Sequence, residues 1–209
     1  MPTLVYAGPV TERTYHHGNL RPALLQRAWD VVDSEGAEAL SLRQLARDVG
    51  VSHGASARHF RDKAALLDAL AVEGFTRMNA ALTDASTRPG TFSERFAASG
   101  RAYVGFAVTH PAVLAVMYSA KHHPDASAEL RALSHIGMTG LIALVAEGQD
   151  AGEVRGGAPE QHALVAFAAV HGVATLATDD LLDGVPWESA ADSVIGFVRR
   201  GLAVAAAPS

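Results

Sequence analysis

Cysteine is absent from the 209 residues of this chain. Its absence excludes a disulfide framework and catalysis by a thiolate, and it suits a reducing cytosol. The N-terminus also lacks the basic start and long apolar run of a secretory signal peptide. The longest apolar run, 163–178, contains His171 and Gly172 and is shorter than a membrane span requires. We therefore expect a cytoplasmic protein without a membrane partner.

The residue patterns of common catalytic sites are missing as well. No Gly-rich phosphate loop follows a strand, and no Gly-x-Ser-x-Gly turn is present. The adjacent histidine pairs, His16–His17 and His122–His123, lack the His-x-x-x-His spacing that places two imidazoles on one helix face. The sequence therefore predicts no enzyme activity, no metal site and no cofactor. A helical enzyme or carrier that binds its substrate inside an apolar bundle is the alternative.

Charged residues are scarce, at 19%, and the formal net charge is −5. The acidic excess lies after Leu82, where eight basic residues stand against thirteen acidic ones. The segment 13–63 instead holds eight basic and six acidic residues. Because phosphate binding depends on local patches rather than on net charge, this mildly basic segment is the candidate for contact with nucleic acid.

Apolar residues make up 49% of the chain and recur at helical spacing, with no convincing run of alternating β-branched residues. The predicted fold class is all-α: an N-terminal three-helix domain with a helix-turn-helix, joined by a long helix to a C-terminal helical bundle. Asn19, Ser41 and Ser52 are placed to cap three of the helices. About nine helices are expected, at roughly 20–34, 41–49, 52–60, 61–85, 92–109, 111–119, 125–149, 160–180 and 187–206.

The segment GVSHGASARHF, from Gly50 to Phe60, is small and polar in a chain otherwise rich in Ala, Leu and Val. Two short helices joined by a tight turn that contains Gly form a helix-turn-helix unit. Here Ala46 is small at the helix crossing, Gly50 lies in the turn and Val51 fills the crossing. Phe60 closes the third helix against the first. The side chains between Val51 and Phe60 therefore have little need to be buried.

Such a helix can lie in the major groove of DNA, with its N-terminal residues at the base edges. Its small residues allow close approach, its polar ones donate hydrogen bonds, and Lys63 at the start of the next helix is a natural phosphate contact. The alternative is a solvated helical hairpin in an ordinary bundle. The predicted DNA-binding residues are Ser41, Arg43, Ser52, His53, Gly54, Ala55, Ser56, Arg58, His59 and Lys63, with His16 and His17 in the N-terminal arm.

Three stretches carry a family resemblance: EGAEALSL, RQLARDVGVS and RHFRDKAALLDAL. From about Tyr15 to Leu82 the chain resembles the DNA-binding domain of the tetracycline-repressor (TetR/AcrR) family of bacterial transcriptional regulators. The segment TYHHGNLRPALL is similar to a branch whose C-terminal domain carries a Trp-x-x-Val-His-Gly signature. This chain reads FAAVHGVATL, with Phe167 where Trp is usual.

The resemblance implies a homodimeric repressor that binds a near-palindromic operator in double-stranded DNA. It also implies release from DNA by a small, mostly apolar effector. The expected domains are an arm at 1–14, a DNA-binding domain at 15–82 with its helix-turn-helix at about 41–60, and a ligand-binding and dimerisation domain at 83–209. The Pro/Gly break STRPGT, at 86–91, follows the long helix at this boundary.

The recognition helix departs from the family pattern at Ala55, Ser56 and Ala57. Relatives often have Thr-Leu-Tyr or Ala-Pro-Tyr there, and the Tyr contacts the operator. With no aromatic hydroxyl at Ala57, we expect Arg58, Ser56 and the histidines of the arm to contribute more. An interaction protein whose degenerate helix-turn-helix no longer binds DNA is therefore a second alternative.

Large side chains of the second domain are the candidate ligand-binding residues: Tyr103, Phe106, Met117, Tyr118, Met138, Phe167 and His171. His171 has two open interpretations, a residue that lines a cavity or a core histidine bonded to a backbone carbonyl. The last two helices are rich in Ala, Val and Gly. Because a monomer would expose part of these surfaces, we expect them to form a two-fold four-helix interface.

Overall fold

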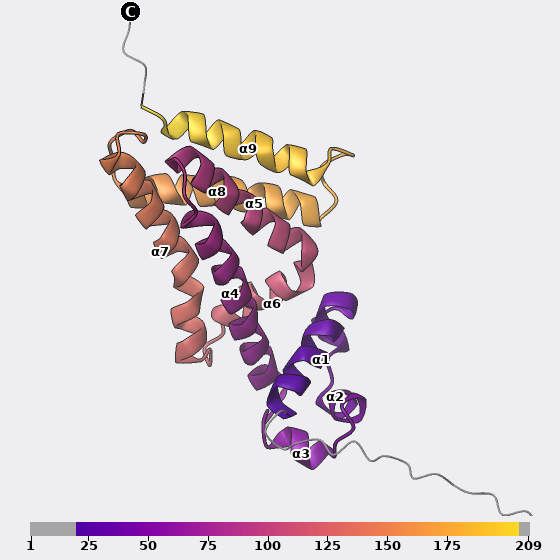
Figure 1. The fold of residues 1–209 in the computed structure, drawn as a ribbon. Helices are drawn as coiled ribbons and strands as arrows, with labels where there is room; N and C mark the ends of the chain where they lie inside the picture. The colour runs from indigo at the N-terminus through magenta and orange to yellow at the C-terminus, as the bar shows by residue number, and fades with distance from the viewer. Residues whose placement is uncertain (1–19, 205–209) are drawn as a thin grey trace, which may run out of the picture.

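The computed structural model describes residues 20–204, which are helical apart from turns, loops and one isolated antiparallel bridge between Val154 and Ala203 (Figure 1). The all-α prediction is confirmed for this part of the chain. The elements are α1 Leu20–Glu35, the 3-10 turn η2 Ala37–Ala39, α2 Leu42–Asp48, α3 His53–Ala57, α4 Lys63–Ser86, α5 Phe92–Thr109, α6 Pro111–Lys121, α7 Ala128–Asp150, α8 Pro159–Thr178 and α9 Trp187–Leu202.

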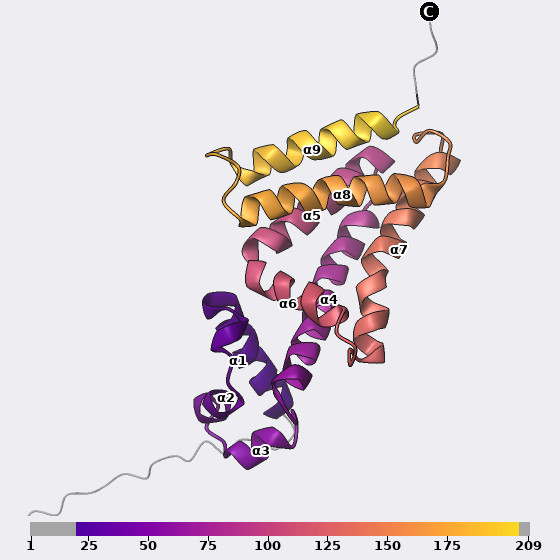
Figure 2. The ribbon, with the colours of Figure 1, turned by 180° about the vertical axis from the view of Figure 1, so that it is seen from behind.

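The helices α1, α2 and α3 form a small unit at one end of the molecule (Figure 1). The long helix α4 begins beside this unit and continues into a larger bundle, where α5, α6 and α7 pack against it. At the opposite end α8 and α9 lie side by side, and α5 packs against both (Figure 2). The predicted connecting helix is therefore α4, and it also forms part of the bundle.

Polar caps explain where several helices begin. The Ser52 hydroxyl accepts a hydrogen bond from the Ala55 amide at 3.2 Å, and the Asp62 carboxylate accepts one from the Ala65 amide at 2.8 Å. These bonds satisfy amides that have no partner within the first helical turn. Ser41, the predicted cap of α2, makes no such side-chain bond.

Two helices end earlier than the sequence pattern predicts. Helix α3 ends at Ala57 rather than near Phe60, because the chain turns there: the His59 amide donates to the Ser56 carbonyl at 3.0 Å. Helix α9 ends at Leu202 rather than at 206. The Leu202 carbonyl accepts a hydrogen bond from the Arg155 amide at 2.8 Å, and this contact with the α7–α8 loop takes the following residue out of the helix.

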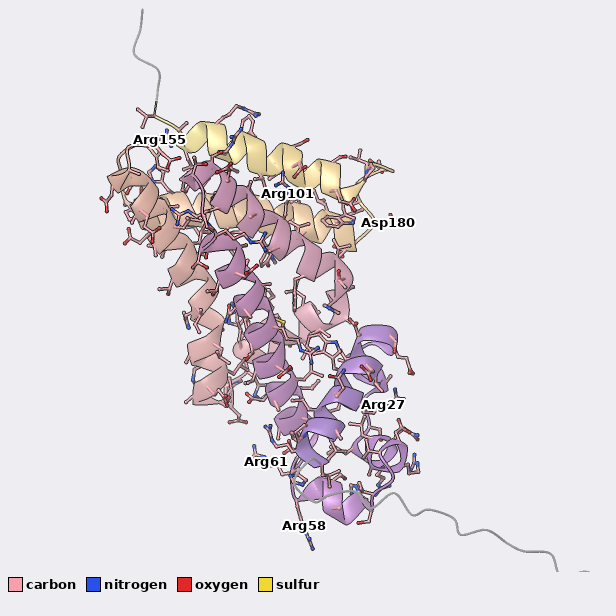
Figure 3. The ribbon with its side chains drawn as sticks, in the orientation of Figure 1. Arg27, Arg58, Arg61, Arg101, Arg155 and Asp180 are labelled. Carbon is pink, nitrogen blue, oxygen red and sulfur yellow. The ribbon has the colours of Figure 1, made fainter. Side chains whose placement is uncertain are left out.

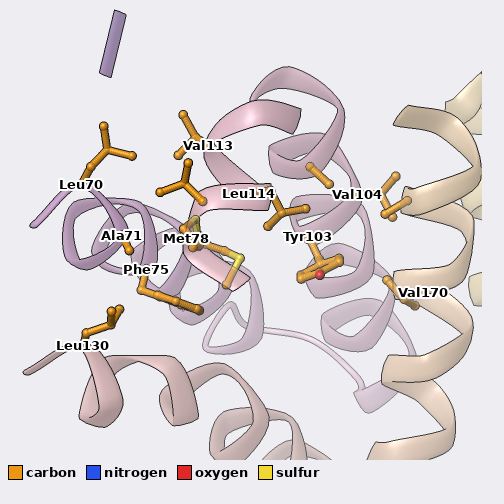
Figure 4. Packing of buried hydrophobic residues seen from close by; sticks show 14 of the residues in the cluster. Leu70, Ala71, Phe75, Met78, Tyr103, Val104, Val113, Leu114, Leu130 and Val170 are labelled. Carbon is orange, nitrogen blue, oxygen red and sulfur yellow. The ribbon is translucent and has the colours of Figure 1, made fainter. Parts of the chain in front are cut away.

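One cluster of buried apolar side chains runs through both units and includes Phe75, Val113 and Leu130 (Figure 4). Helix α6 approaches α4 closely at Gly74, where a β-carbon would lie 2.5 Å from the sulfur of Met117. Closely packed interiors deform little, so a displacement of α4 would be transmitted to α6.

By length and composition, α7 and α8 could each cross a membrane, and the bent pair α5–α6 could form a third span. The run 163–178 is part of a longer helix, because α8 extends over 20 residues. In the fold, α7 packs against α4 and α8, while α8 also packs against α5 and α9. Some apolar residues of these helices therefore form inner faces of the bundle, since 17% of the α7 window and 33% of the α8 window are buried.

Candidate DNA-binding surface and ligand cavity

The connection between α2 and α3 has the geometry of a helix-turn-helix. Gly50 has φ +74°, a left-handed conformation that favours glycine. The Val51 amide donates to the Ala46 carbonyl at 2.8 Å, which closes the turn. Ala46 is buried where the helices cross, and Phe60 is buried too, as the sequence predicts.

Three residues of α3, His53, Gly54 and Ala57, face solvent at the tip of the molecule. Arg58 and Arg61 lie at this tip, and Arg61 is a cation that sequence reasoning did not select (Figure 3). A β-carbon at Gly54 would have no atom within 4 Å, so the backbone there is open to close approach. The predicted DNA-binding residues found exposed are Ser41, Arg43, Ser52, His53, Gly54, Arg58 and His59, while Ala55 and Lys63 are half-buried.

Ser56 does not belong to this exposed surface. Its exposed fraction is 0%, and its hydroxyl donates to the His53 carbonyl at 2.8 Å. Ser56 lies one helical turn before the buried Phe60, so both side chains face the interior. The prediction that Ser56 contacts DNA is therefore wrong.

Lys63 is partly held by the protein at the start of α4. Its ammonium group donates to the Glu38 carbonyl of η2 at 3.4 Å. An ammonium group has three N–H donors, so two are left for a phosphate. His16 and His17 of the arm, and the predicted cap Asn19, lie outside the described residues.

A cavity of about 190 Å³ lies within the larger bundle, bordered by α4, α5, α6, α7 and α8. Much of its wall is apolar, with Phe75 and Met78 from α4 and Leu141 from α7. A mostly apolar wall with a few polar groups is typical of a small-molecule site. The polar groups of this wall include Asn79, Ser99, Tyr103, Tyr118, Lys121 and Ser134.

Four of the predicted ligand-binding residues line this cavity: Tyr103, Tyr118, Met138 and Phe167. Met117 does not, because it is fully buried against Gly74. Phe106 does not either, because its ring packs edge-on against His110, with the centroids 5.4 Å apart. Met117 therefore packs between α4 and α6, Phe106 packs against the residue at the end of its own helix, and neither side chain lines this cavity.

A chain of three hydrogen-bonded side chains runs from the cavity to α8. Tyr103 Oη lies 3.0 Å from Tyr118 Oη and 2.8 Å from His171 Nδ1. Burial raises the pKa of Tyr103, and the Tyr118 hydroxyl adds to this shift. Burial also lowers the pKa of His171, with a further contribution from the charge of Lys121. His171 thus lies behind the cavity wall, and its Nδ1 is bonded to a side-chain hydroxyl rather than to the backbone.

Sequence reasoning missed several polar residues of the wall, among them Asn79 and Lys121. The Asn79 amide nitrogen donates to the Leu133 carbonyl at 3.0 Å, but the buried amide oxygen accepts no hydrogen bond from the described residues. Lys121 Nζ lies 4.6 Å from the centre of the Tyr118 ring, and no described carboxylate lies within 4.0 Å of it. The signal for Asn79 is its place on the apolar face of α4, but Lys121 has no comparable signal.

Two family models match the chain. Residues 24–70 match the model described as bacterial regulatory proteins, tetR family, and residues 96–199 match that of the tetracyclin repressor-like C-terminal domain. The chain belongs to the TetR family. The first match includes α2 and α3, and the second includes α6, α7 and α8 around the cavity.

Solved structures share the fold of this TetR-family protein. A protein of unknown function from Rhodococcus sp. RHA1 is 46% identical over 92% of this chain and 100% of its own, with a TM-score of 0.86. A TetR-family regulatory protein from Rhodococcus RHA1 is 21% identical over 90% and 98%, with a TM-score of 0.71. AibR in complex with isovaleryl coenzyme A and operator DNA is 16% identical over 85% and 97%, with a TM-score of 0.65. The comparison with curated proteins finds no match.

In this TetR-family protein the two units meet at the corner between α5 and α6. His110 Nδ1 lies 2.8 Å from Asp33 Oδ2 of α1, and its ring packs edge-on against Trp29 at a centroid distance of 5.2 Å. Helix α6, which begins at this corner, also carries Tyr118 and Lys121 of the cavity wall. One short helix therefore connects the cavity with the N-terminal unit.

The outer face of α8 and α9 exposes large apolar side chains. Leu164 and Val165 of α8 are 60% and 63% exposed, and Phe197 of α9 is 74% exposed. Monomeric proteins rarely leave large contiguous apolar surfaces in water. This face of the TetR-family protein is therefore the candidate dimer contact.

Proposed function

We propose that this protein is a ligand-responsive transcriptional regulator, a repressor that binds a near-palindromic operator as a homodimer. A small, mostly apolar effector occupies the cavity and releases the DNA. The protein acts in the cytoplasm, without a membrane partner and without enzyme activity. Residues 15–82 form its DNA-binding domain and 83–209 its ligand-binding and dimerisation domain, while 1–14 form an arm.

One observation carries this proposal: helix α4 belongs to both sites. It begins at Lys63, next to the helix-turn-helix, and its residues Phe75 and Asn79 form part of the cavity wall. A ligand that favours a different position of α4 would change the separation of the two α3 helices of a dimer. The effector must bind the two arrangements with different affinities, because otherwise it shifts nothing.

The exposed apolar face of α8 and α9 supports the homodimer. Two-fold packing of this face would bury Leu164, Val165 and Phe197 against the second copy. The same symmetry would place two α3 helices on successive major grooves, about 34–36 Å apart, as a near-palindromic operator requires. AibR, which has the same fold, was solved with both operator DNA and isovaleryl coenzyme A, which supports the combination of a DNA site and a ligand site.

Fluorescence anisotropy tests the proposal. The full chain is titrated onto DNA from upstream of its own gene and onto scrambled DNA, at several salt concentrations. We expect tight, specific binding by two protomers per site, with an affinity that falls as salt rises. Equally weak binding to both DNAs would contradict the proposal and favour the interaction protein. Turnover of a ligand in the cavity would favour the enzyme or carrier.

A further inference from the structure

We infer that the effector is a small carboxylate whose apolar skeleton also carries a hydroxyl or an amide N–H. This inference rests on the proposed function, because it takes the cavity between α4 and α8 as the effector site. Three groups of the cavity wall carry it: the Lys121 ammonium, the Tyr118 hydroxyl and the side-chain oxygen of Asn79.

Lys121 places a positive charge at the cavity. The side chain is half-buried, its ammonium group lies near the Tyr118 ring, and burial lowers its pKa. A partly desolvated cation is unfavourable unless an opposite charge compensates it, and the described residues supply no carboxylate within 4.0 Å. An anionic ligand would compensate it. Because Lys121 is the one cation among the described residues of the wall, a singly charged carboxylate fits better than a phosphate ester.

The Tyr118 hydroxyl can donate to the same carboxylate when the two hydrogen bonds that link His171, Tyr103 and Tyr118 are both donated toward Tyr118. If His171 donates from Nδ1 to Tyr103, then Tyr103 donates to Tyr118, and the Tyr118 proton is free for the cavity. If His171 Nδ1 accepts instead, Tyr103 donates to His171 and Tyr118 donates to Tyr103. Tyr118 can then only accept a hydrogen bond from the ligand. A bound carboxylate therefore selects the tautomer of His171 that carries its proton on Nδ1.

Asn79 sets the second requirement, a hydrogen-bond donor on the ligand. The residue is 7% exposed and lines the cavity, and its oxygen is the unpartnered atom because the Leu133 carbonyl holds its nitrogen. A buried acceptor without a donor is unfavourable, so a ligand that supplies one gains affinity. A β-carbon at Gly137 would lie 3.5 Å from this oxygen, so the glycine leaves room beside it.

Matched probes separate the two requirements. Calorimetric titrations compare 4-hydroxyphenylacetate with phenylacetate, which lacks the donor, and with 4-hydroxyphenylacetamide, which lacks the charge. The compounds 8-hydroxyoctanoate, octanoate and 8-hydroxyoctanamide give the same comparison on a flexible skeleton. In whichever of the two sets binds, we expect the hydroxy acid to bind about tenfold more tightly than the acid without the hydroxyl and than the hydroxy amide. Equal binding of acid and amide, or binding of none of the six, would overturn the inference.

Variants assign each preference to its residue. Lys121→Met should abolish the preference for acid over amide, and Lys121→Arg should retain it. Asn79→Leu should abolish the preference for the hydroxylated acid and leave the preference for acid over amide intact. Arg131→Met, at an exposed position of α7 outside the cavity wall, is the matched control and should change neither preference. A Lys121→Met variant that melts cooperatively yet still prefers acids would contradict the inference.

Operator DNA and nuclear magnetic resonance give independent readouts. If the protein binds its operator specifically but neutral ligands release it better than acids, the inference fails and the proposed function stands. If the hydroxy acid binds as expected but no specific DNA binding occurs, the proposed function fails and the ligand class stands. In the complex, the ¹⁵N spectrum should show the His171 proton on Nδ1. A proton on Nε2 alone would overturn the role given to Tyr118.

Discussion

Arg58, Arg61 and Lys63 are the first three cations that follow α3 in the sequence, and each has a different surrounding. Arg58 is exposed, Arg61 forms a 3.1 Å ion pair with Asp62, and Lys63 donates to a carbonyl of η2. Exposed ion pairs stabilise a protein little, so the pair with Asp62 leaves Arg61 available to a phosphate. Phosphate contacts fix the register of a protein on DNA, while base contacts give specificity.

Replacing Lys63 with Ala should weaken binding to every DNA. It should also make the slope of log affinity against log salt concentration shallower by about one unit, because the protein then neutralises one phosphate fewer. Anisotropy titrations at several salt concentrations measure this slope. Arg88→Ala is the matched control. Arg88 lies just beyond the other end of α4 and forms an exposed ion pair with Asp84 of that helix. An unchanged slope in Lys63→Ala would show that the bond to Glu38 keeps this lysine from the DNA.

Ser56→Ala should leave DNA affinity unchanged, because the hydroxyl is buried and bonded within its own helix. The free energy of unfolding should fall by about 1 kcal/mol or less, the usual contribution of one hydrogen bond. Ser52→Ala is the comparison: it removes the exposed cap of α3 and should cost about 1 kcal/mol. Anisotropy and urea unfolding measure the two quantities. A tenfold loss of DNA affinity in Ser56→Ala would place this hydroxyl on the operator.

Sequence alone predicts the exposed position of Arg58 and the buried position of Phe60, because both follow from the helix-turn-helix pattern. It fails at Ser56, because the faces of a five-residue helix cannot be assigned until its first residue is known. It fails at Asn79 and Lys121 because a polar residue in an amphipathic helix is assigned to solvent. Their places in the cavity wall come from helices that are distant in sequence.

At the scale of helices, glycine determines how closely pairs pack. A β-carbon at Gly74 of α4 would overlap Met117 of α6, and one at Gly100 of α5 would lie 2.8 Å from a methyl carbon of Ile195 in α9. Both glycines are buried, and neither lies in a turn. Their role is therefore close helix packing rather than backbone freedom.

Gly74→Ala should lower the free energy of unfolding by about 1–3 kcal/mol, because the added methyl group overpacks the contact between α4 and α6. The higher helix propensity of Ala offsets up to about 1 kcal/mol of this loss. In Gly140→Ala of α7 no neighbouring atom lies within 4 Å of the new methyl, so this control should gain about 0.5–1 kcal/mol. Urea unfolding measures both. Equal gains would mean that Met117 moves aside at no cost.

The helices themselves are predicted well from apolar periodicity, and the errors lie at their ends. The start of α4 follows from Asp62, whose carboxylate caps it locally. The end of α9 depends instead on Arg155, which lies before α8 and bonds to the Leu202 carbonyl. No local pattern at 203–206 contains that contact, so the sequence extends the helix too far.

At the scale of the molecule, the outer face of α8 and α9 determines assembly. Phe197→Glu should weaken the dimer about tenfold or more, because a charge replaces the most exposed large apolar side chain of that face. Operator affinity should fall with it, since each protomer then binds one half-site. Sedimentation and anisotropy measure the two effects. Thr139→Glu, exposed on α7, is the control and should change neither. A Phe197→Glu protein that remains dimeric would exclude this face as the interface.

The last prediction concerns the coupling between cavity and DNA across the junction of His110 and Asp33. This pair joins the corner that precedes α6 to α1, and α6 carries Tyr118 and Lys121 at its other end. If α6 transmits the effector signal, Asp33→Ala, His110→Ala and the double variant should each lower the coupling free energy by about 0.5–2 kcal/mol. Effector affinity of the DNA-free protein should stay unchanged, because neither residue lines the cavity.

The coupling free energy is measured as the ratio of effector affinities of free and DNA-bound protein, and linkage requires the same ratio for DNA affinity with and without effector. Because Asp33 and His110 contact each other, the double variant should lose no more than the larger single loss. Additive losses would show two independent routes. Full coupling in all three variants would leave α4, which extends from the helix-turn-helix to the cavity, as the helix that carries the signal.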